Sequence, residues 1–128
     1  MIPLSLAQIA QYRSALAAIP EAMVALEMIE DCEGDLEDAA IALALQVGQE
    51  PDRSDQWIDG LAKRWRVTIC RSDIRSRLTL ESLGEALQQL VEDTTLTAKL
   101  ATPILIYVRE TGVAEFCRPL DQRLGDDQ

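Results

Sequence analysis

The sequence predicts an all-α protein, a single antiparallel bundle of about five to seven helices. Three observations lead to this prediction: apolar residues recur at three- and four-residue spacing, glycines and prolines punctuate the periodic segments, and the connections between segments are short. At 128 residues the chain fits one domain of ordinary size. Residues 1–128 are therefore expected to form one helical domain, with about residues 124–128 frayed.

The first three helices are predicted from capping signals. Ser5 has a glutamine three residues later, which is the spacing of a capping box. Pro20 suits the first turn of a second helix, and Gly34 suits the left-handed position that ends it. Asp35 is expected to cap a third helix, which ends before the Gly- and Pro-containing segment 48–55.

The middle of the chain is less regular. A fourth helix is expected to be capped by Ser54 or Asp55. At about 100° per residue, the apolar residues beyond Arg66 point almost opposite to those before it. We therefore expect a break between Arg66 and Ser72, with Ser72 able to cap the helix that follows.

The last third of the chain contains the most regular helical pattern. Strict apolar spacing after Thr79 predicts a helix to about Asp93. A further helix is expected over Leu96–Glu110, where Pro103 introduces a kink or a division into two short helices. Pro119 is expected to limit the final helix to a short one.

Composition and the spacing of the cysteines indicate in which cellular compartment the protein is located. The chain is 48% hydrophobic and only 4% aromatic, which predicts a largely aliphatic core. Cys32, Cys70 and Cys117 are scattered and form no CxxC pair, so they are interpreted as buried thiols in a reducing compartment. Residues 1–20 lack the basic start of a secretory signal, and no apolar run is long enough to span a membrane. Together these features predict a cytoplasmic location.

Charge is sorted into two blocks. The segment Glu21–Asp52 contains ten acidic residues and no basic one, whereas Lys63–Arg77 carries a net charge of +5 from six basic residues and one acidic residue. Separated charge of this kind steers partners and sets their orientation. The formal net charge of −10 argues against a dedicated nucleic-acid binder, because nucleic acid would be repelled at long range.

The basic segment provides the first candidate surface. If the helical register persists across the expected break, Arg64, Arg71 and Arg75 share one face, flanked by Trp57 and Trp65. The arginines could contact an acidic partner or another copy of the chain, bind phosphate or nucleic acid, or offset the acidic helices within the fold. The tryptophans suit either core packing or an interface anchor.

The acidic segment provides the second candidate surface. A calcium-binding loop starting at Asp31 is excluded, because the required glycine and bidentate glutamate positions hold Leu36 and Ala42. The simpler interpretation is an acidic helix–turn–helix facing solvent, with weak binding of a divalent cation as the alternative. The candidate residues of this surface are Glu27, Glu30, Asp31, Glu33, Glu37 and Asp38.

No motif for catalysis is present in the sequence. The chain has no histidine, no phosphate-binding loop and no GxGxxG fingerprint, so no catalytic residue, cofactor or metal is expected. The main hypothesis is a non-enzymatic protein–protein interaction module, an adaptor or regulatory subunit that uses its charged helical surfaces and can self-associate head to tail. The alternatives are phosphate or nucleic-acid recognition through residues 63–77, and a small-molecule pocket between helices.

Overall fold

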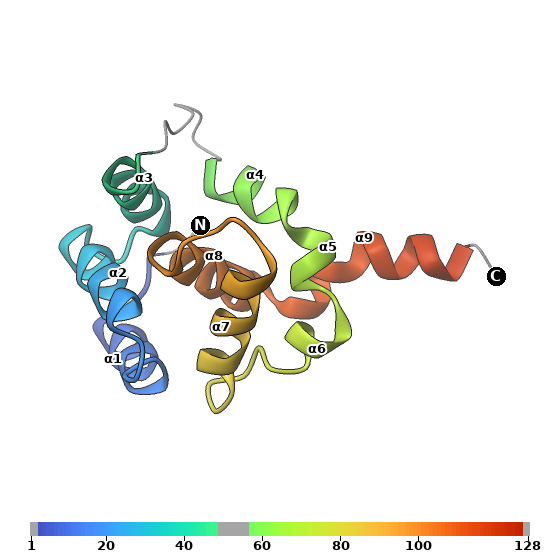
Figure 1. Cartoon of the computed structure of the whole chain (residues 1–128), viewed down its shortest axis with the longest axis horizontal. Coiled ribbons are helices and arrows are strands. Elements are labelled where there is room, and N and C mark those ends of the chain that lie inside the picture. Colours follow the sequence, from blue (N-terminus) through green and yellow to red (C-terminus); the bar gives the residue numbers. More distant parts are fainter. Residues whose placement is uncertain (1–2, 49–56, 127–128) are drawn as a thin grey trace.

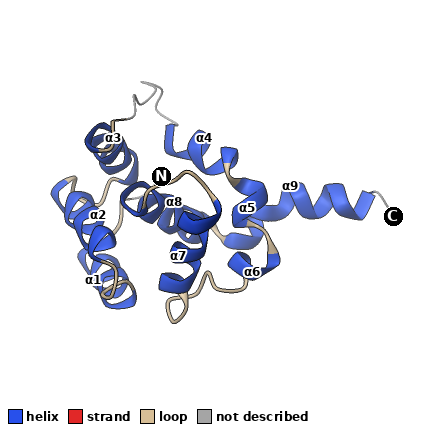
Figure 2. Cartoon of the chain, in the orientation of Figure 1, coloured by secondary structure: helices blue, strands red, loops and turns tan. Residues whose placement is uncertain are grey.

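The chain folds into helices throughout its described part. The computed structural model describes residues 3–48 and 57–126, which form nine helices and no strand (Figures 1 and 2). In chain order these are α1 (Leu6–Ala15), α2 (Pro20–Asp31), α3 (Leu36–Gln46), α4 (Trp57–Arg64), α5 (Arg66–Ile69), α6 (Ser72–Arg75), α7 (Leu83–Asp93), α8 (Ala98–Thr111) and α9 (Val113–Asp126). The predicted all-α class is confirmed. The number of helices exceeds the five to seven predicted, because the middle segment contains two additional single-turn helices.

Helix α8 forms the centre of the bundle, and α2, α3, α4, α7 and α9 pack against it (Figure 1). All seven residues from Leu100 to Ile106 are buried, so this part of α8 contacts protein on every side. The buried apolar side chains form one cluster, which is mainly aliphatic and includes Tyr12 and Phe116. A single core of this kind is the physical basis of a single domain.

The predicted ends of the first helices are confirmed. Ser5 and Gln8 form a reciprocal capping box, with the Ser5 Oγ accepting the Gln8 N–H and the Gln8 Oε1 accepting the Ser5 N–H. Pro20 opens α2. Gly34 has a φ of +84°, and its carbonyl accepts the Leu4 N–H at 3.0 Å. A Cβ at this position would lie 2.2 Å from the Leu4 carbonyl oxygen, so the close approach of the two segments requires glycine.

The break predicted in the middle segment is confirmed, but its cap is different. Arg71 takes the extended N-cap position of α6, and Ser72 is already the first helical residue. The prediction that Ser72 caps this helix is therefore wrong. The change of direction allows both Ile69 of α5 and Ile74 of α6 to be fully buried, which one straight helix with the register of α4 would not achieve.

Helices α7 and α8 differ from the predictions in detail. Helix α7 starts at Leu83, because residues 79–82 form a turn in which the Thr79 hydroxyl accepts the Ser82 N–H. Helix α8 continues through Pro103 and is not divided. The proline removes one backbone donor near the start of a long helix, and burial on all sides keeps the rest of the helix in place.

The final helix is longer than predicted. Helix α9 contains 14 residues and continues through Pro119, so the expected short helix is wrong. Pro119 is exposed, and so is Glu115, whose carbonyl lacks the usual hydrogen bond to residue 119; water can therefore satisfy this carbonyl. Beyond its first turns, α9 extends away from the other helices toward the C-terminus (Figure 1).

A disulfide joins the base of α9 to the middle segment. Cys70 and Cys117 are bonded, with their Cα atoms 5.7 Å apart and a sequence separation of 47, whereas Cys32 is not bonded. The expectation of three buried thiols is therefore wrong. The fold brings together two cysteines whose wide separation leaves no motif in the sequence. The described helices include none that is both long and apolar enough to cross a membrane.

Candidate interaction surfaces

The three arginines of the basic segment lie on different elements. Arg64 ends α4, Arg71 precedes α6, and Arg75 ends α6, with two changes of helix direction between the first and the last. The uninterrupted register that would place them on one face is absent. They are therefore three separate surface positions.

Two of these arginines are paired with carboxylates of the same chain. Arg75 forms a two-pronged ion pair with Asp121 of α9, at 2.9 and 3.0 Å. Arg71 binds Asp73 at 2.6 Å and also Asp93 at the end of α7. Hydrogen bonds from Arg75 and Arg71 lower the pKa values of Asp121 and Asp73, respectively. Two further ion pairs of the segment are Lys63–Asp59 and Arg77–Glu85.

Both tryptophans are half-buried and pack against the core. The guanidinium of Arg64 lies 5.6 Å from the ring centre of Trp65, and that of Arg66 lies 4.9 Å from the ring centre of Phe116. These contacts, together with the position of Trp57 at the start of α4, place the aromatic rings between the core and the charged surface. Of the three predicted arginines, Arg64 is the one that forms no ion pair within the described residues.

Glu37 of the acidic segment has a structural role. Its two carboxylate oxygens accept the backbone N–H groups of Trp57 and Ile58, each at 2.8 Å. The first turn of α4 is therefore capped by a side chain from α3. The predicted caps Ser54 and Asp55 lie outside the described residues.

The other acidic candidates lie around the end of α2 and the start of α3. Glu30 forms an ion pair with Arg13 of α1. The remaining four form no ion pair with the described residues, and we call them the acidic corner: Glu27, Asp31, Glu33 and Asp38. All four are exposed. The structure therefore leaves a group of carboxylates directed to solvent on this corner.

The environment of Cys32 reflects the negative charge of this corner. Its thiol is partly buried between α2 and α3. Burial raises the pKa of Cys32, and the nearby carboxylates of Asp38, Asp35 and Asp31 raise it further. The thiol is therefore held in its protonated, weakly nucleophilic form.

The two charge blocks do not neutralise each other within the described residues. The carboxylates paired with the basic segment all lie outside Glu21–Asp52, and they are Asp59, Asp73, Glu85, Asp93 and Asp121. Four of the six basic residues of the segment are paired, whereas Arg64 and Arg66 form no ion pair with the described residues. The interpretation that the basic segment offsets the acidic helices is therefore not supported by these pairs. The acidic corner keeps its charge.

Two hollows lie along one seam. On one side of it are α1 and its connection to α2, and on the other side are α7 and the turn before it. Together we call the two hollows the α1–α7 groove. The first has a volume of about 400 Å³ and is lined by Ala18, Ile19, Pro20, Glu21, Leu87, Gln88, Val91, Glu92 and Ala98. The second has a volume of about 430 Å³ and is lined by Gln11, Ser14, Ala15, Leu80 and Glu81. On the α7 side Gly84 lies between them, where a Cβ would be 3.7 Å from the Ile19 Cδ1.

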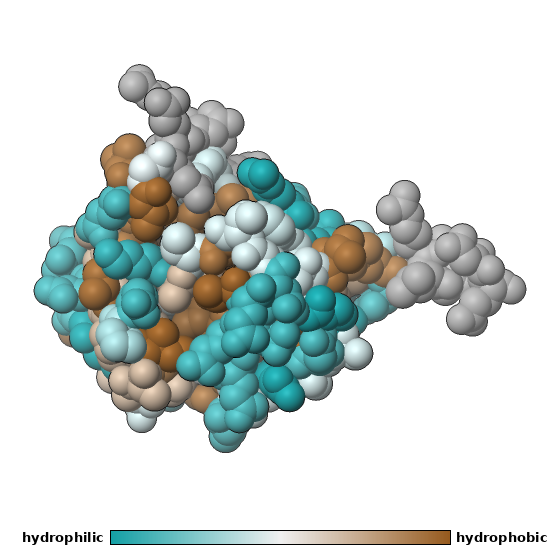
Figure 3. All heavy atoms as spheres, in the orientation of Figure 1, coloured by the Kyte–Doolittle hydropathy of each residue, from teal (hydrophilic) through white to brown (hydrophobic). Residues whose placement is uncertain are grey.

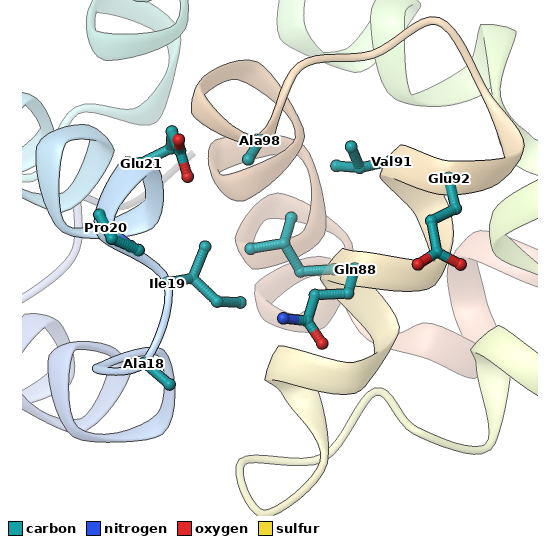
Figure 4. A pocket seen from close by; sticks show the side chains of 9 residues that line it. Ala18, Ile19, Pro20, Glu21, Gln88, Val91, Glu92 and Ala98 are labelled. Atoms are coloured by element: carbon teal, nitrogen blue, oxygen red, sulfur yellow. The ribbon is translucent and has the colours of Figure 1, made fainter.

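The groove combines an apolar floor with an acidic rim. Ile19 and Leu87 are buried at its base, and hydrophobic side chains are visible between the α1–α2 side and α7 in Figure 3. Ile19 faces Val91 across the first hollow, while the carboxylates of Glu21 and Glu92 lie at opposite edges (Figure 4). The second hollow adds Glu81. Such a surface suits an apolar ligand that also carries positive charge.

Sequence reasoning missed the carboxylates that pair with the basic segment. Asp93 and Asp121 lie 22 and 46 residues from their arginines, so no local spacing indicates these pairs. The Asp59–Lys63 pair was missed too, although its four-residue spacing is a usable signal, because it places two side chains on adjacent turns of a helix. The groove has no sequence signal either, since its sides come from helices far apart in the chain.

The described residues contain no cluster suited to metal binding, and the chain has no histidine. No protein-family model matches the chain, and neither the curated proteins nor the solved structures contain a match.

Proposed function

We propose that the protein is a non-enzymatic interaction module, an adaptor or regulatory subunit, that binds a basic surface of a partner protein through the acidic corner. One observation carries this proposal. The carboxylates of the acidic corner are exposed and have no ion-pair partner in the described part of the chain, whereas four of the six basic residues of the basic segment are paired with other carboxylates. Unneutralised charge of one sign favours a partner of the opposite sign and accelerates encounter with it.

The basic segment has a smaller part in this proposal. A partner or a nucleic-acid phosphate that contacts Arg71 or Arg75 has to compete with the carboxylates already bound to them. Arg64, stacked on Trp65, is the member of the predicted basic surface that remains open to a partner. Charge therefore favours the acidic corner as the main contact, with Arg64 and Trp65 as a second contact.

The location of the protein is a separate question. A cytoplasmic location was predicted from the cysteine pattern, but the Cys70–Cys117 disulfide argues for a compartment in which disulfides persist. Blocking free thiols in intact cells before lysis distinguishes a reducing compartment from an oxidising one. Modification of Cys32 alone indicates an oxidising compartment, and modification of all three cysteines indicates a reducing one.

The test is affinity capture from native lysate with the immobilised full chain at low and at moderate salt. The acidic-corner variant is Glu27→Lys with Asp31→Lys. The control changes the net charge equally at exposed positions outside both the acidic corner and the groove, and carries Leu45→Lys, Gln46→Lys, Ala114→Lys and Gln122→Lys. A third variant carries Arg64→Glu, Arg71→Glu and Arg75→Glu. Circular dichroism establishes that each variant is folded.

We expect a partner protein that the wild type and the control capture and that the acidic-corner variant loses. Weaker capture at moderate salt would agree with an electrostatic contact. Loss of the partner with the arginine variant alone would contradict the proposal and favour the basic segment. Recovery of nuclease-sensitive nucleic acid would favour the nucleic-acid alternative.

A further inference from the structure

We infer that the α1–α7 groove binds a basic amphipathic helix from a partner protein. This goes beyond the proposed function, because it assigns a second surface with its own ligand chemistry. The groove lies at the start of α2, whereas the acidic corner lies around its end. Three features of the groove support this inference: its shape, its apolar floor and the negative charge of its rim.

The shape of the groove suits a helix. One side is formed by α1 and the connection to α2, and the other by α7 and the turn before it. On α7, the residues Gly84, Leu87, Gln88 and Val91 recur at the three- and four-residue spacing of one helical face. From Gly84 to Val91 this face is about 10 Å long at 1.5 Å per residue. That length matches two turns of a bound helix.

The two hollows provide places for apolar side chains. A helix bound in a groove places its anchors at positions i, i+3, i+4 and i+7, which requires depressions along one line. The hollows have volumes of about 400 and 430 Å³. The first lies between the α1–α2 connection with the start of α2 and the helix α7, and the second lies between α1 and the turn before α7. Ile19 and Leu87 supply apolar surface at the base of the first hollow, and Leu80 supplies it in the second. The occupant therefore needs apolar residues on one face.

The rim determines the charge of the occupant. The ionisable side chains that line the groove are Glu21, Glu81 and Glu92, and no lysine or arginine is among the lining residues. A bound helix with lysine or arginine beside its apolar face would place positive charge next to these carboxylates. An acidic helix would meet repulsion from both edges.

The same charge argument disfavours α9 of a second copy as the occupant. Its sequence Val113–Asp126 has a net charge of −1, from two basic and three acidic residues. Arg118, which would be needed to contact the rim, pairs with Glu115 of its own helix. We therefore assign the groove to a segment of a different protein and not to α9 of a second copy.

A labelled synthetic peptide, with leucines at helical anchor spacing and lysines elsewhere, tests this inference by fluorescence anisotropy against the full chain. A peptide with glutamates in place of the lysines is the ligand control. We expect Glu81→Lys with Glu92→Lys to weaken binding of the lysine peptide by about tenfold or more. The matched variant with Leu45→Lys, Gln46→Lys, Ala114→Lys and Gln122→Lys should weaken it by less than about threefold, because it changes the net charge equally but away from both the groove and the acidic corner.

A second pair of variants tests the hollow without changing charge. Ala17 and Ala18 are both exposed, but only Ala18 lines the first hollow. Ala18→Trp should fill the hollow and weaken binding by about tenfold, while Ala17→Trp should leave it unchanged. Circular dichroism and the unfolding midpoint of both variants show that the fold is retained.

Three results would overturn the inference. Equal weakening by Glu81→Lys with Glu92→Lys and by the matched lysine variant would mean that the peptide senses only the net charge. Equal behaviour of Ala18→Trp and Ala17→Trp, or no binding of the lysine peptide to the wild type, would mean that the groove is not its site. Self-association of the wild type that Ala18→Trp abolishes would assign the groove to a second copy. These results leave the capture experiment on the acidic corner unaffected, so the two proposals can fail separately.

Discussion

The carboxylate of Glu37 accepts the backbone N–H of Trp57 at 2.8 Å, across 20 residues of chain. Its second oxygen accepts the N–H of Ile58. A residue of the acidic segment therefore caps the helix that leads into the basic segment. The acidic and basic segments are thus connected by a helix cap and not, within the described residues, by an ion pair.

Replacement of Glu37 should destabilise the fold. Glu37→Ala leaves two N–H groups at the start of α4 without their acceptor, so the free energy of unfolding should fall by about 1–2 kcal/mol. Urea unfolding measures this change. The control is Glu27→Ala, an exposed position without a described ion pair, which should change stability by less than about 0.5 kcal/mol. Equal losses from the two variants would show that Glu37 does not act as a cap.

Replacement by alanine should lower the stability of the fold at Gly34 and raise it at Gly84. Gly34→Ala places a Cβ 2.2 Å from the Leu4 carbonyl oxygen at a φ of +84°, so stability should fall by more than about 2 kcal/mol. Gly84→Ala places a Cβ at ordinary contact distance, 3.7 Å from Ile19, inside a helix. It should raise stability by about 0.5–1 kcal/mol, because alanine loses less entropy on forming a helix. Thermal or urea unfolding of both variants checks the two signs, and a loss at Gly84 would contradict the expectation that a Cβ fits there at ordinary contact distance.

Reduction of Cys70–Cys117 should lower stability measurably. The bond closes a loop with a sequence separation of 47, and removal of such a constraint costs about 2–4 kcal/mol. Guanidinium unfolding with and without reductant measures the loss, and Cys70→Ala with Cys117→Ala should reproduce it. The control Cys32→Ala keeps the disulfide and should lose as much stability on reduction as the wild type, whereas the double variant should be insensitive to reductant. Titration of the unfolded, unreduced protein should detect one thiol, and detection of all three would contradict the disulfide.

Alkaline pH should destabilise the protein through its two tyrosines. Burial raises the pKa of Tyr12 to about 12, although Arg109 acts in the opposite direction, and burial with a hydrogen bond to Asp59 raises the pKa of Tyr107 to about 12. The unfolded value is 10.0, so above it the folded state holds protons that the unfolded state releases. The stability contributed by these groups is therefore complete below pH 10 and is lost between pH 10 and 12.

Phenolate absorbance during an alkaline titration measures this effect directly, because Tyr12 and Tyr107 are the two tyrosines of the chain. Tyr12→Phe and Tyr107→Phe assign the two transitions. Each variant should show one remaining transition near pH 12 in the folded state. Transitions near pH 10 in the folded protein would contradict the burial of the phenols.

Helix ends were predictable where the signal lies within a few residues. Ser5 with Gln8, Pro20, Gly34 and Asp35 occupy the predicted positions, because caps and left-handed ends depend on neighbouring backbone groups. The single-turn helices and the cap at Arg71 were not foreseen. Their geometry depends on which apolar side chains have to reach the shared core.

The candidate surfaces were predictable only in part. Composition located the acidic and basic segments, and the acidic corner retains the character that its sequence indicates. Whether an arginine is available depends on carboxylates such as Asp93 and Asp121, which tertiary packing places beside it. The pairing of Cys70 with Cys117 is equally a product of that packing.

The sequence by itself determined that the chain is all-α, where its first helices begin and end, and where its charges are concentrated. These properties follow from local periodicity, capping and composition, which act over one or two turns of helix. Only the tertiary structure decided which charges neutralise each other, which cysteines pair and where α1 and α7 leave a groove. Those features arise because helices that are far apart in the chain bury their apolar faces around α8. The local spacing of residues does not predict that arrangement.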